Sequence, residues 1–127
     1  MRKQYYLKPS SRGLLAWDVD RLIALTADLP VRDLPLEKVR ELDEPHWYGA
    51  EGDVPTVRSV AEHARLMEEA ELEHPVILSA EGRVMDGMHR IAKAWLAGRT
   101  TVPAVRFEVD PPPDFVGVDP EELPYDA

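Results

Sequence analysis

The chain has 127 residues and no cysteine. This absence excludes a disulfide framework, a zinc–thiolate site and a cysteine nucleophile. No apolar run approaches the roughly 20 residues of a membrane-spanning helix. The basic N-terminus, MRKQYYLKPSSRG, is not followed by an apolar stretch of signal-peptide length. We therefore expect a cytoplasmic protein without a membrane anchor, of a length that suits one domain with its own core.

Basic residues are few compared with acidic ones, at 15 against 24, and the formal net charge is −9. Binding to DNA depends on cationic contacts that displace counterions from the phosphates, so autonomous DNA binding is not expected. A local basic pocket for one small anion is compatible with this charge. No two of the four histidines have metal-ligand spacing, so no zinc site is expected, and His63 and His74 are assigned structural roles.

The N-terminal third shows one helical pattern. The first dozen residues are expected to be irregular, and Asp18 is a suitable N-cap. After it, apolar residues recur at helical spacing as far as Leu29, and Pro30 ends the helix. The segment VRDLPLEKVREL is interpreted as a short strand, a proline turn and a second short segment. A loop with two glycines and two prolines follows from Asp43 to Pro55.

A second helix is predicted over Thr56 to Leu72. Its N-cap is either Thr56 or Ser59, because Ser59 has Glu62 three residues later, as in a capping box. The spacing of its apolar residues predicts that its inner stripe is formed by Val57, Val60, Ala64 and Met67.

The C-terminal half predicts a strand, a turn, a returning strand, a helix and a last strand. The apolar run Val76–Leu78 suggests a strand covered on both faces. The helix Met88–Ala97 is expected to bury Ile91, Ala94 and Trp95 and to end at Gly98 as its C′ residue. In the strand TVPAVRFEV, Pro103 belongs at the start, an edge or a bulge, because proline has no N–H to donate.

These elements predict an α+β fold, with a small mixed sheet flanked by helices. Residues 1–110 would form a single domain whose residues 1–30 are a helical extension. Residues 111–127 are a proline-rich acidic tail. The tail is extended or disordered unless Phe115, Val116 and Tyr125 dock on the body.

The stretch VMDGMHRIAKAWLAG places an aspartate, a glycine and a His-Arg pair between a strand and a helix. Gly87 permits positive φ and close approach of a ligand to the backbone. Amides at the start of a helix lack intrahelical partners, and the helix dipole favours an anion there. His89 and Arg90 would add donors, and Asp86 could hold a divalent cation or orient His89. This combination suits a polyphosphate, with or without Mg²⁺.

The same residues also fit an ordinary structural junction. Asp-Gly is a common turn pair, Asp86 can cap the helix, and His89 and Arg90 can be solvated residues of its first turn. The pattern is neither a Walker A loop nor a dinucleotide-binding glycine fingerprint, so spacing by itself leaves both interpretations open.

The stretch Val31 to Phe107 resembles the ParB/sulfiredoxin-like superfamily, as a stand-alone domain. The segment LPLEKVREL resembles the first strand and turn of that family. After a variable loop, VAEHARLMEEAELEHPVILSAEGRVMDGMHRIAKAWLAGRTTVPAVRF follows the family's order of helix, apolar strand, DG.HR turn, helix, Gly…Val-Pro turn and last strand. Members include partition proteins that bind CTP, sulfiredoxins that use ATP, and free serine kinases.

The resemblance implies ATP or another nucleoside phosphate with Mg²⁺ as the ligand. By position, Gly87, Met88, His89 and Arg90 would form the phosphate-binding turn, and Asp86 would lie beside the metal or the base, as a metal ligand or catalytic residue together with His89. Met88 stands where sulfiredoxins have cysteine, so reduction of a sulfinic acid is not expected. The MDGMHR turn is most similar to the version in the serine kinases.

Further site residues follow from the same resemblance. The kinase relatives use a glutamate after the first strand as a base. Four carboxylates lie in that region: Glu37, Glu41, Asp43 and Glu44. Glu41 and Glu44 are the leading candidates for the base. The alternative is that they are ordinary surface carboxylates. Arg58 and Ser59 begin a helix that touches the nucleotide in sulfiredoxin-like relatives.

The aromatic pair Trp47 and Tyr48 has two interpretations. It can stack on a nucleobase or anchor its loop on the body, and the anchor is favoured.

Three functions remain open at this point. The first is a nucleotide-binding domain, as an ATP-dependent phosphotransferase acting on a small-molecule acceptor. The second is a non-catalytic module that recruits a protein partner to the acidic tail and the Trp47–Tyr48 loop. The third is a DNA-associated partition or nuclease-like protein, which the net charge opposes.

Overall fold

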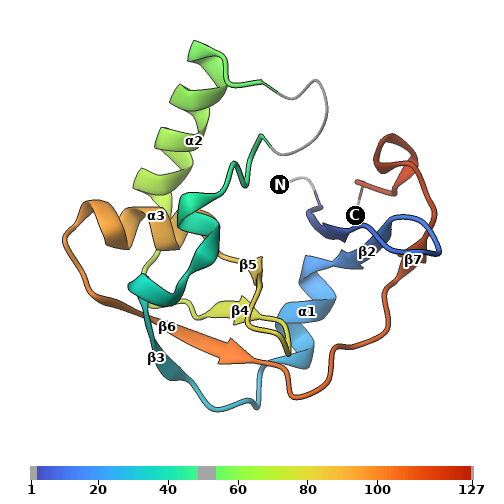
Figure 1. The fold of residues 1–127 in the computed structure, drawn as a ribbon, viewed down its shortest axis with the longest axis horizontal. Helices are drawn as coiled ribbons and strands as arrows, with labels where there is room; N and C mark the ends of the chain where they lie inside the picture. Colours follow the sequence, from blue (N-terminus) through green and yellow to red (C-terminus); the bar gives the residue numbers. More distant parts are fainter. Residues whose placement is uncertain (1–2, 49–53, 127) are drawn as a thin grey trace.

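The computed structural model describes residues 3–48 and 54–126, which fold into two small β-sheets and three α-helices (Figure 1). The larger sheet has the order β3-β6-β4-β5 and the smaller sheet the order β1-β2-β7. Neighbouring strands are antiparallel except β4 and β6, which are parallel. The predicted α+β class with a small mixed sheet is confirmed. The strands are β1 Tyr5–Lys8, β2 Leu15–Asp18, β3 Arg32–Pro35, β4 Val76–Leu78, β5 Val84–Asp86, β6 Thr101–Arg106 and β7 Phe115–Val116.

The helices are α1 Val19–Leu25, α2 Val57–Glu69 and α3 Met88–Leu96. Short 3-10 turns cover Leu36–Lys38, Arg40–Asp43 and Pro120–Glu122. Within residues 3–48 and 54–126, the helices all fall short of the length and apolarity that a bilayer crossing requires. Of the loop predicted between β3 and α2, residues 49–53 lie outside the described part of the chain.

The larger sheet is covered on both faces, as the apolar run of β4 predicts. Val76 and Leu78 point into one hydrophobic cluster, beneath α3, whereas Ile77 joins a second cluster beneath α1. Alternation along a strand sends neighbouring side chains to opposite faces, so an uninterrupted apolar sequence needs cover on both. The sheet residues Val76 and Leu78 thus pack beneath α3, close to the point where β5 leads into that helix.

The N-terminal residues form a strand pair, so the prediction of an irregular start is wrong. Strand β1 pairs with β2 through an antiparallel register that joins Tyr5 to Asp18 and Lys8 to Leu15. The predicted cap is confirmed, because an Asp18 carboxylate oxygen accepts from the Asp20 amide. Helix α1 is shorter than predicted: the Thr26 hydroxyl donates to the carbonyls of Leu22 and Ile23 and closes the last turn.

The inner face of α2 differs from the predicted stripe. Val57 and Val60 are 89% and 52% exposed, and Ala64 is exposed as well, whereas Met67 is partly buried as predicted. The half-buried positions instead follow the line of Ser59 and His63, whose side chains have polar partners in the body. Hydrogen bonding therefore rotates the helix away from the orientation that apolar spacing favours. The Thr56 cap forms a capping box with Ser59 rather than Glu62.

The C-terminal elements mostly follow prediction. Ile91 and Ala94 are fully buried, and Gly98 has φ 75° as the residue after the α3 cap, but Trp95 is 62% exposed rather than buried. Position 95 lies beside the α3 residues that face the sheet, and the ring projects to solvent. Pro103 pairs with Asp33 of β3, and the pairing of β6 with β4 begins only at Ala104.

The proline-rich tail docks on the body. Phe115 and Val116 form β7 against β2, and Leu123 is buried. The Tyr125 ring packs edge-on against Tyr5, with centroids 5.4 Å apart. The sequence left open whether Phe115, Val116 and Tyr125 dock on the body, and in the structure all three do.

Candidate functional site

Gly87 joins β5 to α3 in a conformation that glycine alone adopts easily. Its φ is 115° and ψ 18°. A methyl group added there would lie 2.9 Å from Val76 Cγ2 and 3.1 Å from Arg90 Nη2. Left-handed backbone and close packing together therefore require glycine. No side chain caps α3 at this end, so its first amides keep their capacity to donate.

This helix start opens into the wall of a cleft of about 1060 Å³. The cleft runs between β1, the segment after β3, strand β5 and the first turn of α3. Asp86, Gly87, Met88, His89 and Glu41 all line it, so the structure brings together five of the residues that the sequence analysis selected.

Charged side chains of both signs line the cleft. Four basic and three acidic side chains line it, in a chain whose net charge is −9: Lys3, Lys8, Arg40 and Arg83 against Glu41, Glu81 and Asp86. Three of these four cations already have carboxylate partners: Lys3 pairs with Asp18 and Asp20, Lys8 with Glu81, and Arg83 with Glu41 and Glu44. Among the described residues, Arg40 is the lining cation without an ion pair.

His89 is held in a three-ring arrangement with His63 and Trp47. The His63 Nδ1 and His89 Nε2 atoms are 2.8 Å apart and share a hydrogen bond between α2 and α3. The Trp47 ring stacks on both imidazoles, with centroid distances of 4.2 Å to His63 and 4.7 Å to His89. Trp47 also packs on the larger core cluster. Trp47 therefore anchors its loop on the body; because it also lines the cleft, its stacking on a nucleobase stays a prediction.

His63 is a site residue that the sequence analysis did not select. It was assigned a structural role because it stands 26 residues from His89 and no motif connects the two. The signal that was available is its position four residues after Ser59, on the same side of the helix.

His89 has a lowered pKa, of about 4 compared with the usual 6.5. Partial burial is the main cause, followed by the neighbouring His63, His46 and Arg90, each of which disfavours a second positive charge. His89 is therefore a neutral imidazole near pH 7. It can hold an anion as an N–H donor but not as a cation.

This shift predicts acid destabilisation. Because the unfolded chain binds the His89 proton below pH 6.5 and the folded chain only near pH 4, stability falls as the pH drops through that window. We expect a loss of about 1–2 kcal/mol, less than the full shift implies because the ring is partly exposed to solvent. Urea unfolding at pH 7.5 and pH 4.5 measures it. The His89→Gln variant should lose less unfolding free energy between the two pH values, whereas His74→Gln should lose as much as the wild type. An equal loss in all three proteins contradicts the prediction.

Arg90 is committed to the protein itself. Its Nη2 atom lies 2.8 Å from Asp86 Oδ2, and its Nη1 atom donates to the carbonyls of His74 and Pro75 at 3.0 and 3.1 Å. Arg90 is not among the residues that line the cleft. Its guanidinium therefore joins the start of α3 to the approach to β4, and the neighbouring His89 alone of the pair faces the cleft.

A divalent cation has no preformed site at the junction. The carboxylate of Asp86, the predicted Mg²⁺ ligand, is bound to Arg90, and it belongs to no cluster of potential ligands among the described residues. The three side chains that do group, with ligand atoms within 4.8 Å of one another, are the exposed Glu71, Glu73 and His74. The residues at the junction thus do not by themselves fit a resident metal.

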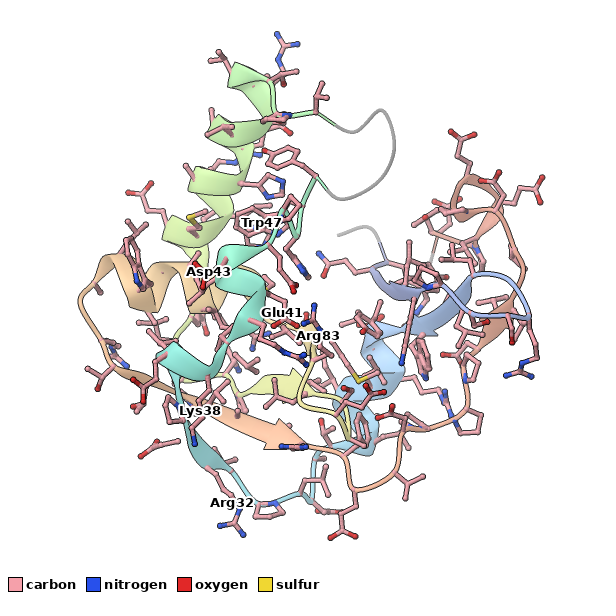
Figure 2. The ribbon with its side chains drawn as sticks, in the orientation of Figure 1. Arg32, Lys38, Glu41, Asp43, Trp47 and Arg83 are labelled. Carbon is pink, nitrogen blue, oxygen red and sulfur yellow. The ribbon has the colours of Figure 1, made fainter. Side chains whose placement is uncertain are left out.

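The two leading base candidates share one arginine, as Figure 2 shows for Glu41 and Arg83. Glu41 is 3% exposed, its Oε2 accepts from the Val84 amide at 2.7 Å, and Arg83 Nε lies 3.3 Å away. The same guanidinium pairs with Glu44 and holds the pKa of that carboxyl below its usual range through a hydrogen bond. Both carboxylates are thus already paired with Arg83, which leaves them less free to accept a proton from a substrate.

The other candidates lie outside the cleft lining. Arg58 is on the exposed side of α2, and Ser59 is occupied by the capping box and by a 3.1 Å hydrogen bond to the Tyr48 hydroxyl. Glu37 and Asp43 are exposed on the two 3-10 turns.

Comparison of the chain with protein-family models, curated proteins and solved structures found no match.

Proposed function

We propose that this chain is a nucleotide-binding domain of the ParB/sulfiredoxin-like fold, which holds the phosphates of its ligand at the start of α3. The observation that carries the proposal is the uncapped helix start at Gly87, which faces a cleft of about 1060 Å³. Ligand sites for small molecules commonly have volumes of about 300–1,000 Å³. Free amides and the helix dipole at such a place favour an oxyanion.

Charge in the cleft supports an anionic ligand. Arg40, from the 3-10 turn Arg40–Asp43, lines the cleft without an ion pair among the described residues. An anion could also share Lys8 with Glu81 and Arg83 with its two glutamate partners. His89 adds a neutral donor. The resemblance assigns Arg90 to the phosphates. In the structure its guanidinium instead binds Asp86 and the carbonyls of His74 and Pro75, and so stabilises the start of α3.

Binding is better supported than phosphoryl transfer. A general base needs a lone pair free to accept the proton of the acceptor hydroxyl. Arg83 engages both Glu41 and Glu44, and Asp86 is paired with Arg90. Any Mg²⁺ would therefore arrive with the phosphates, since Mg²⁺ in such sites is commonly held by substrate phosphates and few protein ligands.

Calorimetric titration with pyrophosphate, ATP and CTP, with and without Mg²⁺, tests the proposal. We expect saturable binding that His89→Ala weakens about tenfold, the order of magnitude for losing one hydrogen bond to a charged group. His74→Ala is the matched control, because His74 is an exposed histidine bonded to Glu71 and outside the cleft. Failure of every ligand to bind the wild-type protein, or an equal effect of the two substitutions, would overturn the assignment.

A further inference from the structure

We propose that His63 is a positioning residue for His89: by donating its Nδ1–H to His89 Nε2, it makes the opposite ring nitrogen of His89 the donor that meets a ligand in the cleft. The inference deepens the proposed function and rests on it for the identity of the ligand, an oxyanion. It concerns a residue on another helix, α2, that contributes no atom to the cleft lining.

The two imidazoles have a limited number of arrangements. Each neutral ring carries one N–H, and the 2.8 Å hydrogen bond between His63 Nδ1 and His89 Nε2 uses one of them. If His89 donated in this bond, its proton would be on Nε2 and its Nδ1 would be unprotonated, able only to accept a hydrogen bond. If His63 donates, the N–H of His89 is on Nδ1. An anion in the cleft repels a lone pair and accepts from an N–H, so only the second arrangement suits it.

The Nδ1 atom of His89 is available for that contact. Among the described residues it has no hydrogen-bond partner, whereas no buried side-chain nitrogen or oxygen in this part of the chain lacks one. Nδ1 is therefore reached from solvent, on a residue that lines the cleft. The second nitrogen of a ring whose first is fixed by a partner is the usual point at which a histidine meets its ligand.

Trp47 covers both rings of the pair, whose planes are inclined by 21° to one another. Its indole lies nearly parallel to both imidazoles, at interplanar angles of 13° to His63 and 15° to His89. This cover limits rotation of either ring and shields the bond from water on one side. Tyr48 packs edge-on against His63 from the same loop.

The charges around His89 favour the neutral pair. His63 from α2, His46 from the segment after the 3-10 turns and Arg90 from α3 each lower the His89 pKa, in addition to burial. Asp86 and Glu41 also line the cleft, but each already has an arginine partner. The His89 ring is therefore neutral and donates through its single N–H. We expect its contribution to anion binding to stay constant between pH 5 and pH 8.

Nitrogen-15 NMR of the histidine rings in the ligand-free protein at pH 7.5 tests the arrangement directly. We expect His89 to carry its proton on Nδ1 in the wild type, and to show mixed tautomers in His63→Phe, which keeps a ring beneath Trp47 but no donor. His63→Asn, whose amide can donate from a similar position, should restore the single tautomer. Tyr48→Phe removes the neighbouring hydroxyl and should change nothing. A proton on Nε2 in the wild type, or the same tautomer ratio in wild type and His63→Phe, overturns the inference.

Pyrophosphate binding gives the second readout. We expect His63→Phe to bind about fivefold more weakly at pH 7.5, the scale of one hydrogen bond that is no longer aligned. The deficit relative to wild type should shrink as the pH falls, because removal of His63 raises the His89 pKa and the ring becomes a cation. A constant deficit across pH contradicts the role of His63. If the wild-type protein does not bind pyrophosphate, the proposed function fails, and the ligand-free tautomer still decides on His63.

Discussion

Replacing Gly87 with alanine is expected to lower the free energy of unfolding by about 3 kcal/mol, as the sum of backbone strain and a steric clash. The φ of 115° is unfavourable for any residue with a Cβ. The new methyl group would also lie 3.3 Å from Val76 Cα, which is backbone of a central strand and cannot move aside. Chemical denaturation with urea measures the change.

Gly98→Ala is the matched control. Gly98 also has positive φ, at 75°, but a methyl group there meets no atom within 4 Å. Its cost should be about 1 kcal/mol, the strain alone. The difference between the two variants isolates the contact with Val76. Equal losses would mean that the junction is less tightly packed than described, and that glycine is needed there only for its backbone conformation.

Replacing Glu41 with leucine is expected to cost about 2–4 kcal/mol, because the carboxylate joins two elements from inside the protein. It accepts from the Val84 amide of β5 and pairs with Arg83, while its own backbone belongs to the 3-10 turn Arg40–Asp43. Leucine leaves a buried N–H without a partner. Arg83 retains Glu44 and some contact with water, which keeps the loss from being larger.

Glu44→Gln separates burial from charge in the same network. Glu44 is exposed and bonded to the same guanidinium, and an exposed ion pair contributes little to stability. We expect the urea midpoint of Glu44→Gln to stay close to that of the wild type, while Glu41→Leu moves it clearly downwards. If both variants unfold at the same urea concentration, the buried contacts of Glu41 with Val84 and Arg83 do not stabilise the fold as proposed.

The sequence predicted the second half of the fold well because local rules decide it. The buried run at Val76–Leu78, the glycine at position 87 and the helix end at Gly98 each depend on neighbours within a few residues. The start of the chain was predicted poorly. Among the described strands, β1 pairs with β2 alone. Pro9 and Ser10, which resemble the end of an irregular segment in the sequence, lie in the loop of this hairpin.

The candidate site was predictable in composition but not in its contacts. Asp86 to His89 do line the cleft, as the turn pattern suggested. That Arg90 serves two backbone carbonyls cannot be derived from the sequence, because carbonyls leave no residue signature. The pairing of His63 with His89 depends on the rotation of α2, which polar contacts decide against the apolar pattern of Val57 and Val60.

The pairing of β2 with β7 has a consequence for synthesis of the protein on the ribosome. Leu15 and Ala16 find their partners, Val116 and Phe115, about a hundred residues later in the chain. A nascent chain can close the hairpin of β1 and β2 early, but the free edge of β2 stays unpaired until Phe115 and Val116 have left the exit tunnel. Tyr125 follows β7 in the chain, so the part of the cleft wall that it lines forms only after β7 has been synthesised.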